Sequence, residues 1–408
     1  MTKRNNGEGH IRQRPNGLWE ARYSYTVDGD LKRGSVYGPT KTATREKLIA
    51  VLDRVKDERA PVDSTQTLAT WAAEWVRTTL EVSDRKETTK QTYGYITKSN
   101  IIDSAIGPVK MRDLKPSHLD KYFGALKTQG LSASTRRNIY AVLSAILKGA
   151  IRDGLLDRNP LDKISRPKAE HVEAVFLEPH ETKALLEQLD PANRPADPER
   201  AYEHERDYLL GKFLALTGLR RGEALGLDWF NANTTKGRIN IRWTLSRVRG
   251  QLIRTEPKTT NSRRVLDLSP DAVRVLEQVR DLQKRSRVEI LPSAKVSREA
   301  RGGAPLDRHE WKDENLVFTT REGKAMEPRN LLRMIAAAAK RAGITKTVGT
   351  HTLRHSAATA MLMGGQSIFT VSRYLGHESI DITVRYYGHI GETGLKDASN
   401  TLARMLSL

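Results

Sequence analysis

Hydrophobic and polar residues alternate near the N-terminus, between residues 19 and 27, which is typical of a strand with one buried face. Turn-forming Pro-Asn-Gly and Asp-Gly-Asp sequences flank this stretch. Neighbouring strands are expected at residues 10–14 and 31–37, and a helix is expected to begin at Thr44. Residues 1–60 are therefore predicted to form a small α+β domain, in which one helix covers a sheet.

The hydrophobic pattern changes to helical spacing in the next hundred residues, as in the apolar stripe at residues 139–150. Ser117 followed by Asp120 resembles a capping box at the start of another helix. We expect residues 66–165 to form a helical bundle whose apolar stripes pack together as its core. The helix-breaking pair Asn159-Pro160 is expected to end it.

A polar, proline-containing stretch then predicts a linker at residues 163–178. Beyond it, an apolar helical stripe at 209–216 precedes an alternating strand at 239–245 and a return strand at 265–268. Two highly polar stretches are expected to be surface loops or extended helix ends: residues 190–205 and 283–314. The block 175–392 is thus predicted to be a mixed, mainly α domain, and the whole chain to be multidomain and mainly α with small β-sheets.

Composition adds a partner to this picture, because 69 Lys and Arg residues against 49 Asp and Glu residues give a formal net charge of +20. Such an excess attracts polyanions and favours nucleic acid, although an anionic membrane surface attracts positive charge too. The N-terminus lacks the apolar core of a signal peptide, and no apolar run approaches membrane-spanning length. We therefore expect a cytoplasmic protein with no membrane partner. The 408 residues contain no cysteine, which excludes disulfides and cysteine-ligated zinc.

Arginine, histidine and tyrosine residues gather near the C-terminus, in the sequences Thr350–His355, Leu375–His377 and Tyr386–His389. Arginine offers a planar fork for phosphate oxygens, histidine offers hydrogen-bond donors and a proton near neutral pH, and tyrosine offers an oxygen nucleophile. Together they indicate attack on a phosphodiester. His351 and His355 also have the spacing of a metal-binding pair on one helix, but the adjacent arginine and the incomplete pattern disfavour a metal, and we predict none.

A further string, Thr-Gly-Leu-Arg-Arg-Gly-Glu-Ala-Leu at residues 217–225, is expected to follow one helix and open another. With the three C-terminal sequences, its order and spacing resemble the tyrosine recombinase, or phage integrase, family over residues 175–392. The predicted bundle resembles the core-binding domain of that family, and the N-terminal block resembles the arm-type DNA-binding domain of larger phage integrases. The resemblance implies a site-specific DNA recombinase that cuts and rejoins strands through a 3′-phosphotyrosyl intermediate, with no cofactor.

The resemblance assigns the phosphate contacts residue by residue. Arg220 and Arg354 would clamp the scissile phosphate, whereas an isolated arginine is more often a surface ion-pair partner. His351 would contact the phosphate and handle protons, and His377 would donate a hydrogen bond to it. Glu223 is expected to orient or pair with Arg220.

The resemblance also assigns the general acid, the nucleophile and a supporting residue. Lys258, within a Lys-Thr-x-x-Ser-x-Arg pattern in the turn between two predicted strands, would protonate the leaving 5′ oxygen, whereas a lone turn lysine is usually solvated. Tyr387 fits the spacing of the nucleophile, two residues before His389, and the adjacent Tyr386 is the alternative. His355 is expected to be structural.

Basic residues outside the catalytic block are candidate DNA contacts, and a solvated surface is the alternative explanation for them. They lie in the two N-terminal blocks and are Arg12, Arg14, Arg22, Lys32, Arg33, Lys86, Lys90, Arg136 and Arg137.

The resemblance further implies double-stranded DNA with core and arm sites as the partner, a homotetramer on that DNA, and action at the nucleoid of a bacterial host. A DNA-bending protein and a directionality factor are candidate accessory partners. Residues 393–408 carry a short apolar stripe, which the resemblance favours as a contact with a neighbouring protomer; packing on its own domain is the alternative. The alternatives are a transposon-encoded or resolvase-like tyrosine recombinase, a type IB topoisomerase, and a DNA-binding regulator without catalysis.

Overall fold

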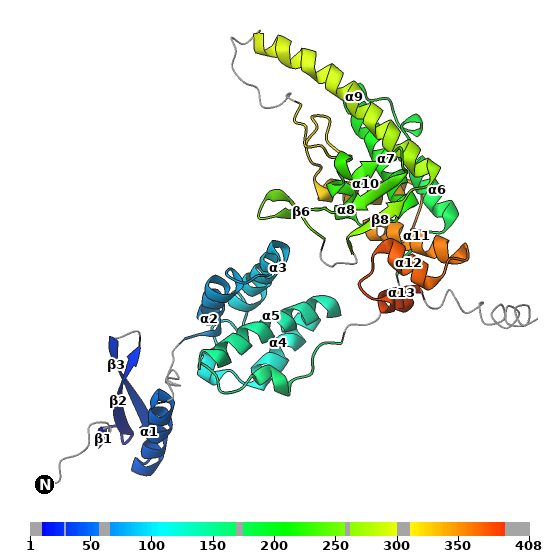
Figure 1. The fold of residues 1–408 in the computed structure, drawn as a ribbon. Coiled ribbons are helices and arrows are strands. Elements are labelled where there is room, and N and C mark those ends of the chain that lie inside the picture. The colour runs from blue at the N-terminus through cyan, green and yellow to red at the C-terminus, as the bar shows by residue number, and fades with distance from the viewer. Residues whose placement is uncertain are drawn as a thin grey trace, which may run out of the picture. The chain divides into compact units, whose positions relative to one another are not determined.

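The computed structural model of the chain describes residues 10–27, 30–56, 66–168, 174–257, 262–299 and 311–387 (Figure 1). The chain divides into two compact units, Met1–His171 and Val172–Leu408. The sheets are small and antiparallel, and helices predominate among the described elements. The expectation of a multidomain, mainly α chain with small β-sheets is therefore confirmed, whereas the three proposed domain boundaries stay predictions.

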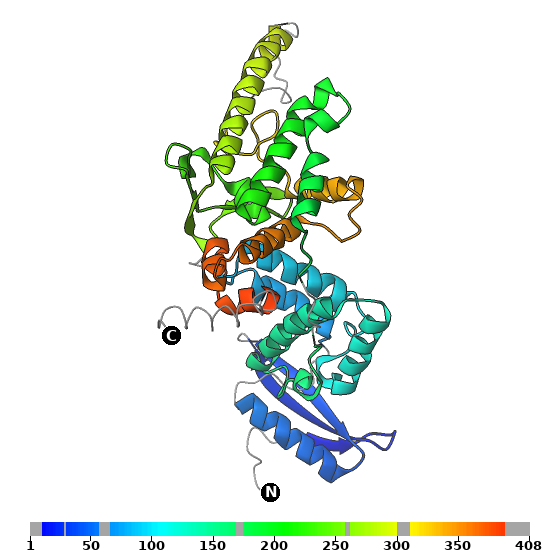
Figure 2. The same ribbon diagram turned by 90° about the vertical axis from the view of Figure 1, so that its right-hand side faces the viewer.

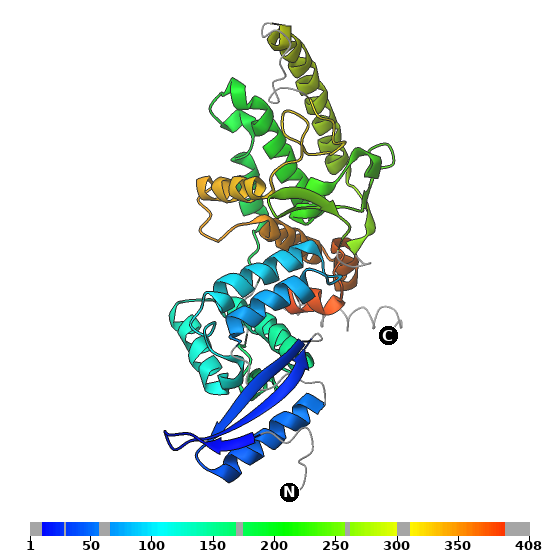
Figure 3. The same cartoon turned by 90° about the vertical axis from the view of Figure 1, so that its left-hand side faces the viewer.

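The N-terminal elements are a three-stranded antiparallel sheet and one helix. The sheet has the order β1 (His10–Gln13), β2 (Trp19–Val27) and β3 (Asp30–Gly38), and α1 (Lys41–Lys56) lies along one face of it (Figure 3). The odd-numbered side chains of β2 face α1, so that Ala21 is buried against the helix. This leaves the even-numbered side chains of β2 on the open face of the sheet.

The covering helix begins at Lys41, three residues earlier than predicted. The reason is local, because Thr40 accepts a hydrogen bond from Ala43 N through Oγ1 (3.2 Å) and from Thr44 N through its carbonyl (3.1 Å). Thr40 therefore caps the helix in the manner typical of a hydroxyl-bearing residue.

Four α-helices form the bundle in the remainder of the first unit. They are α2 (Leu68–Trp75), α3 (Glu87–Thr97), α4 (Pro116–Thr128) and α5 (Ala133–Arg152), with π-helical turns at Val76–Leu80 and Lys98–Ile102. The predicted apolar stripes are buried in one cluster, and Trp71 Nε1 donates to Ile146 O at 3.0 Å inside it.

Two local features within the bundle differ from the prediction. Pro116 opens α4, so Ser117 is already inside the helix and does not cap it. The bundle also continues past Asn159-Pro160, because the chain makes a 3₁₀ turn at Pro160–Lys163 that buries Leu161 in the core. At the other end of the predicted linker, Leu177 is buried in the core of the second unit.

The second unit surrounds one large hydrophobic cluster. Its helices are α6 (Pro179–Glu187), α7 (Ala201–Thr217), α8 (Arg221–Gly226), α9 (Pro270–Glu299), α10 (Pro328–Arg341), α11 (Thr350–Met363), α12 (Ile368–Leu375) and α13 (Ile380–Tyr387). Its strands form a sheet of order β4 (Ala232–Asn233), β5 (Arg238–Ile241) and β8 (Arg264–Asp267), and a hairpin of β6 (Thr244–Val248) and β7 (Gln251–Thr255). Short 3₁₀ turns occur at Met111–Asp113 in the bundle and here at Pro191–Asn193, Pro198–Arg200 and Trp229–Asn231.

The strand predicted at residues 239–245 is two strands in two different sheets. β5 pairs with β8 as expected, with Ile239 opposite Leu266, but the chain leaves this sheet before β6 begins. The cause is α8, which packs directly on this segment, since a Cβ on Gly226 would lie 2.9 Å from Leu245 N. Hydrophobic residues continue to alternate with polar ones between β5 and β6, so the sequence pattern gave no sign that the strand ends.

The polar stretch from Gln283 is an extended helix end as far as residue 299, because it continues α9. Figures 1 and 2 show this end of α9 running beyond the other elements of the second unit. None of the helices in the described ranges is both long enough and apolar enough to cross a membrane.

Candidate active site

Arg220 lies in the tight turn that joins α7 to α8. α7 ends at Thr217, and Gly218 caps it in the left-handed conformation at φ 61°. A Cβ at position 218 would lie 3.0 Å from Leu375 Cδ2 and 3.2 Å from Ala357 Cβ, so both the backbone conformation and the space require glycine. The turn thereby holds the end of α7 against α11 and α12.

Arg354 lies on α11 and joins the ends of two other helices. Its guanidinium donates from Nη1 to Gly218 O at 2.9 Å and from Nη2 to Leu375 O at 2.7 Å. These carbonyls belong to helix ends, which lack intrahelical donors, so the arginine satisfies them and is itself held in one orientation. Its side chain is only 4% exposed, and a guanidinium so deep retains its charge.

Glu223 holds two arginines beside this junction. Its carboxylate accepts from Arg220 Nη1 at 2.7 Å and from Arg264 at 3.1 and 3.2 Å, while Arg220 Nη2 donates to Gly376 O at 2.8 Å. Burial acts to raise the pKa of Glu223, but Arg264, Arg220 and Arg354 outweigh it and lower the pKa. The carboxylate is therefore ionised and fixes the direction of Arg220.

Arg264 is the member of this cluster to which sequence reasoning assigned no role. It begins β8, is largely buried, and also donates from Nε to Tyr374 O at 2.7 Å. Arg264 thus ties the β-sheet to α12 through its guanidinium. The sequence did contain a feature that could have identified Arg264, because the Lys-Thr-x-x-Ser-x-Arg pattern ends at this residue.

Three histidines surround the arginines. His351 and His355 lie on α11, on either side of Arg354, and His377 follows α12 directly after Gly376, which adopts the left-handed conformation at φ 69°. His377 Nδ1 lies 2.7 Å from Oγ1 of Thr383, a buried residue of α13. The hydrogen bond links the histidine to the helix that ends at Tyr387.

The cluster keeps all three imidazoles neutral at pH 7. Burial, together with Arg354 and Arg220, lowers the pKa of His377 to about 3. Burial, together with His351 and Arg354, lowers the pKa of His355 to about 4. Desolvation, followed by Arg354 and Arg221, also lowers the pKa of His351. A neutral imidazole offers one N–H donor and one acceptor, which suits hydrogen bonding to a phosphate.

These shifts predict that the free energy of unfolding falls as the pH is lowered from about 6.5 towards 4. In that window the unfolded chain protonates histidines that the folded chain keeps neutral, so acid favours unfolding. One fully shielded histidine contributes a slope of up to about 1.4 kcal/mol per pH unit. His355→Gln should therefore lose less stability between pH 7 and pH 5 than the unaltered chain, as measured by urea unfolding.

The exposed His180→Gln is the matched control for this measurement. It should keep the pH dependence of the unaltered chain. Equal pH dependence in His355→Gln and the unaltered chain would show that His355 is not held neutral by the fold.

Two predicted catalytic groups lie outside what the structure describes. Lys258 belongs to residues 258–261, which are not described, and the described chain resumes shortly before β8. Lys258 was predicted to lie in a single turn between the strands at 239–245 and 265–268. The structure instead places the hairpin of β6 and β7 between β5 and β8, so Lys258 follows β7. Tyr386 and Tyr387 end α13, but their side chains are not described, so the choice between them stays a prediction.

The basic residues of the N-terminal sheet converge on one acid. Arg12, Arg14 and Arg22 form ion pairs of 2.8, 3.2 and 3.3 Å with Glu20, whose side chain is 2% exposed. Burial acts to raise the pKa of Glu20, but hydrogen bonds from these arginines lower it to about 2. The residues share the open face of the sheet, opposite α1. Sequence reasoning missed Glu20, although its place on the polar face of β2 was visible.

The other candidate DNA contacts are more varied. Arg33, Lys86 and Arg137 are exposed, Arg136 is partly buried, and the side chain of Lys32 lies outside the described residues. Lys90 is only 11% exposed, because it pairs with Glu87 at 3.0 Å and donates to Glu81 O at 2.9 Å. The ammonium group of Lys90 is therefore used in contacts that stabilise the start of α3.

Comparison with known proteins places this site in a family. The family model described as Phage integrase family matches residues 176–392, more than half of the chain. The chain belongs to the phage integrase family. Its relatives include a tyrosine recombinase XerC-like protein of Caldanaerobacter subterraneus subsp. tengcongensis, 26% identical over 92% of each chain. The chain is a tyrosine-type site-specific DNA recombinase.

Two solved structures of integrases share its fold. One is the Tn1549 transposon integrase in complex with transposon right-end DNA, at a TM-score of 0.63 and 19% identity, covering 83% of this chain and all of that one. The other is a lambda integrase tetramer bound to a Holliday junction, at a TM-score of 0.55 and 16% identity, covering 94% of this chain and 96% of that one.

Proposed function

We propose that this integrase cuts DNA by attack of the Tyr387 hydroxyl on a backbone phosphate. The attack forms a 3′-phosphotyrosyl bond and releases a 5′ hydroxyl, and a 5′ hydroxyl from a partner duplex then displaces the tyrosine. Each step exchanges one phosphoester for another, so no nucleotide hydrolysis is required. The observation that carries the proposal is the convergence of Arg220, Arg354 and His377 at the ends of α7 and α12, next to the helix that ends at Tyr387.

Arg220 and Arg354 act as the phosphate clamp in this mechanism. Charge spread over the non-bridging oxygens in the transition state is stabilised best by donors that are already oriented. Arg354 is oriented by two helix-end carbonyls, and Arg220 by Glu223 and Gly376 O. Glu223 and Arg264 are positioning residues, since their contacts fix Arg220 and the end of α12.

The neutral histidines supply uncharged donors and acceptors to the same phosphate. Since Nδ1 of His377 is engaged with Thr383, its Nε2 is the nitrogen that faces the phosphate. His351 contacts the phosphate and relays protons at the N-terminal end of α11, and His355 supports Arg354. Lys258, in the connection between β7 and β8, is the general acid for the leaving 5′ oxygen.

The partner is double-stranded DNA, and the assembly is a homotetramer across two duplexes. The charge of +20 supports a polyanionic partner, and the fold is shared with a lambda integrase that forms a tetramer on a Holliday junction. In this assembly the helical bundle binds the core sites of the DNA, and the N-terminal sheet binds the arm sites. Residues 393–408 contact a neighbouring protomer. A DNA-bending protein and a directionality factor complete the set of partners.

Covalent capture tests the proposal. The full chain is incubated with a library of duplexes, each carrying a nick that lets the cleaved end diffuse away, and protein-linked DNA is isolated under denaturing conditions and sequenced. We expect recovery of a family of sites that contain an inverted repeat, as two protomers on one duplex require. Duplex binding without any covalent product would favour the non-catalytic regulator instead.

The arginine cluster on the N-terminal sheet makes a separate prediction about arm sites. Glu20→Gln removes the acid that aligns Arg12, Arg14 and Arg22 and adds one positive charge. Binding to random duplex should therefore tighten, because charge attracts phosphates regardless of sequence. Preference for a selected arm duplex over random duplex should fall roughly tenfold, because base contacts need fixed side chains. Competition binding measures both.

Glu46→Gln is the matched control, since Glu46 is exposed on α1, the helix that covers the other face of the sheet. It adds the same charge without touching the arginines. Equal loss of preference in both variants would assign the effect to charge alone and would remove the positioning role of Glu20.

A further inference from the structure

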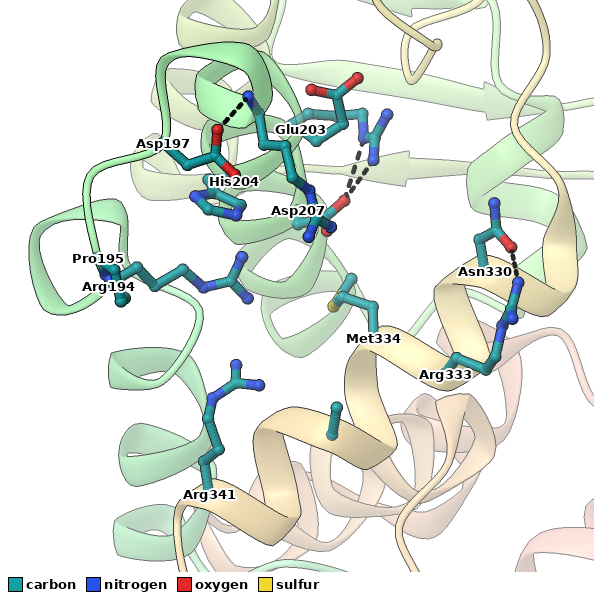
Figure 4. A pocket seen from close by; sticks show the side chains of 13 residues that line it. Arg194, Pro195, Asp197, Glu203, His204, Asp207, Asn330, Arg333, Met334 and Arg341 are labelled. Atoms are coloured by element: carbon teal, nitrogen blue, oxygen red, sulfur yellow. Dashed lines mark hydrogen bonds and ion pairs between the residues drawn. The ribbon is translucent and has the colours of Figure 1, made fainter.

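A pocket of about 750 Å³ lies between α10 and the N-terminal part of α7 with the turns that precede it (Figure 4). Its size falls within the range of pockets that hold small ligands. It shares no residue with the candidate active site. Asp207 in the pocket and Thr217 near Arg220 are ten positions apart on α7, which corresponds to about 15 Å along the helix.

Two guanidinium groups lie side by side at one end of this pocket. Arg194 Nε and Arg341 Nη2 donate to the same carbonyl, Gln188 O, at 3.3 and 2.8 Å. In the described part of the chain neither arginine forms an ion pair. Figure 4 shows both side chains reaching into the same space from different elements. Burial and then the neighbouring Arg341 lower the pKa of Arg194, while Asp207 acts in the opposite direction.

The carboxylates that line the pocket do not compensate for this charge. Five arginines and three acidic residues line the pocket. One of the acids, Asp207, is already paired with Arg206 at 2.7 Å. Asp197 accepts a hydrogen bond from the backbone nitrogen of Arg200 at 3.3 Å. The pocket therefore has an excess of positive charge concentrated at the Arg194 and Arg341 side.

The helix that carries Arg341, α10, also supplies two uncharged side chains to the pocket. α10 presents Met334 and Ala337 to the pocket, while Leu331, Ile335 and Ala338 on its other side are buried in the core. Glu203 also lines the pocket and has one carboxylate oxygen that is buried without a hydrogen-bond donor. The guanidinium forks and the adjacent uncharged side chains together fit a ligand that carries a phosphate and an uncharged body.

We propose that this pocket is a second phosphate site, in which Arg194 and Arg341 bind a phosphate group of a ligand of roughly mononucleotide size. A free phosphate-bearing molecule and a backbone phosphate of DNA offer the same chemistry to the two arginines. In either case the bound anion separates and neutralises the two guanidiniums.

The test uses the full chain and three variants, Arg194→Gln, Arg341→Gln and the matched control Lys340→Gln. Lys340 is exposed on the same helix and does not line the pocket. In the first arm, sodium pyrophosphate is titrated by calorimetry. In the second arm, binding to a random duplex is measured over a series of salt concentrations. Urea unfolding identifies any variant that fails to fold. If one arginine variant does not fold, the result is taken from the other arginine variant.

Pyrophosphate binding should weaken about tenfold or more in each arginine variant and stay unchanged in Lys340→Gln. If the natural source is a free molecule, the salt dependence of duplex binding stays that of the control. If the source is DNA, the logarithmic salt slope falls by about one unit for each arginine removed. Pyrophosphate and duplex binding that match the control in both folded arginine variants would overturn the proposal.

Discussion

Replacing Tyr387 by phenylalanine is expected to abolish covalent linkage to DNA while leaving duplex binding close to that of the unaltered chain. The substitution removes a single oxygen, which is the proposed nucleophile, and keeps the aromatic ring at the end of α13. Positive charge on the two N-terminal blocks and the catalytic unit is untouched, so affinity for the duplex should persist. A nicked duplex and a denaturing gel measure the covalent product, and a native gel measures binding.

Tyr386→Phe is the matched control, because it removes the same atom from the neighbouring residue. We expect it to retain covalent linkage. Full linkage in Tyr387→Phe together with loss in Tyr386→Phe would reverse the assignment of the nucleophile.

Arg354→Ala is expected to slow strand cleavage by roughly a thousandfold or more, as measured in single-turnover reactions on nicked duplex. The guanidinium is buried and held by Gly218 O and Leu375 O, so the substitution removes a donor group that the fold has already oriented. It also leaves two carbonyls without donors, and a loss of stability is expected in addition. Urea unfolding at the temperature of the assay separates this loss from the loss of catalysis.

Arg373→Ala provides the comparison for the second prediction. Arg373 is exposed on α12, two residues before Leu375, whose carbonyl accepts from Arg354, and its guanidinium lies 5.7 Å from the ring centre of Phe369. Its removal should change the cleavage rate by only a few-fold. A folded Arg354→Ala protein that cleaves within tenfold of the unaltered rate would exclude Arg354 from the phosphate clamp.

Local patterns predicted the elements that depend on local physics. Alternation predicted β2 and its open face, and helical spacing predicted the buried stripes of α5 and α7. The turn after Thr217 was also visible, because a glycine followed by a new helix start is a typical C-terminal cap. The same patterns gave a wrong prediction where packing against another element ends a strand. At residues 239–245 the alternation continues from β5 into β6, although the two strands belong to different sheets.

The contacts that orient the site were harder to predict because they join distant parts of the chain. Glu223 meets Arg264 across 41 positions, and Arg354 meets Gly218 across 136 positions. The Arg194 and Arg341 pair depends in the same way on the packing of α10 against α6 and α7. Motif spacing identified several of these residues, but it did not show which partner holds each of them.

The most direct test of the central claim is the identity of the residue that carries the DNA. The covalent complex captured from the library is digested with a protease and a nuclease, and the peptide that retains a nucleotide remnant is sequenced by mass spectrometry. The remnant is predicted on Tyr387, attached through a 3′ phosphate. A remnant on Tyr386 or on any other residue, or a 5′ linkage, would contradict the proposed mechanism.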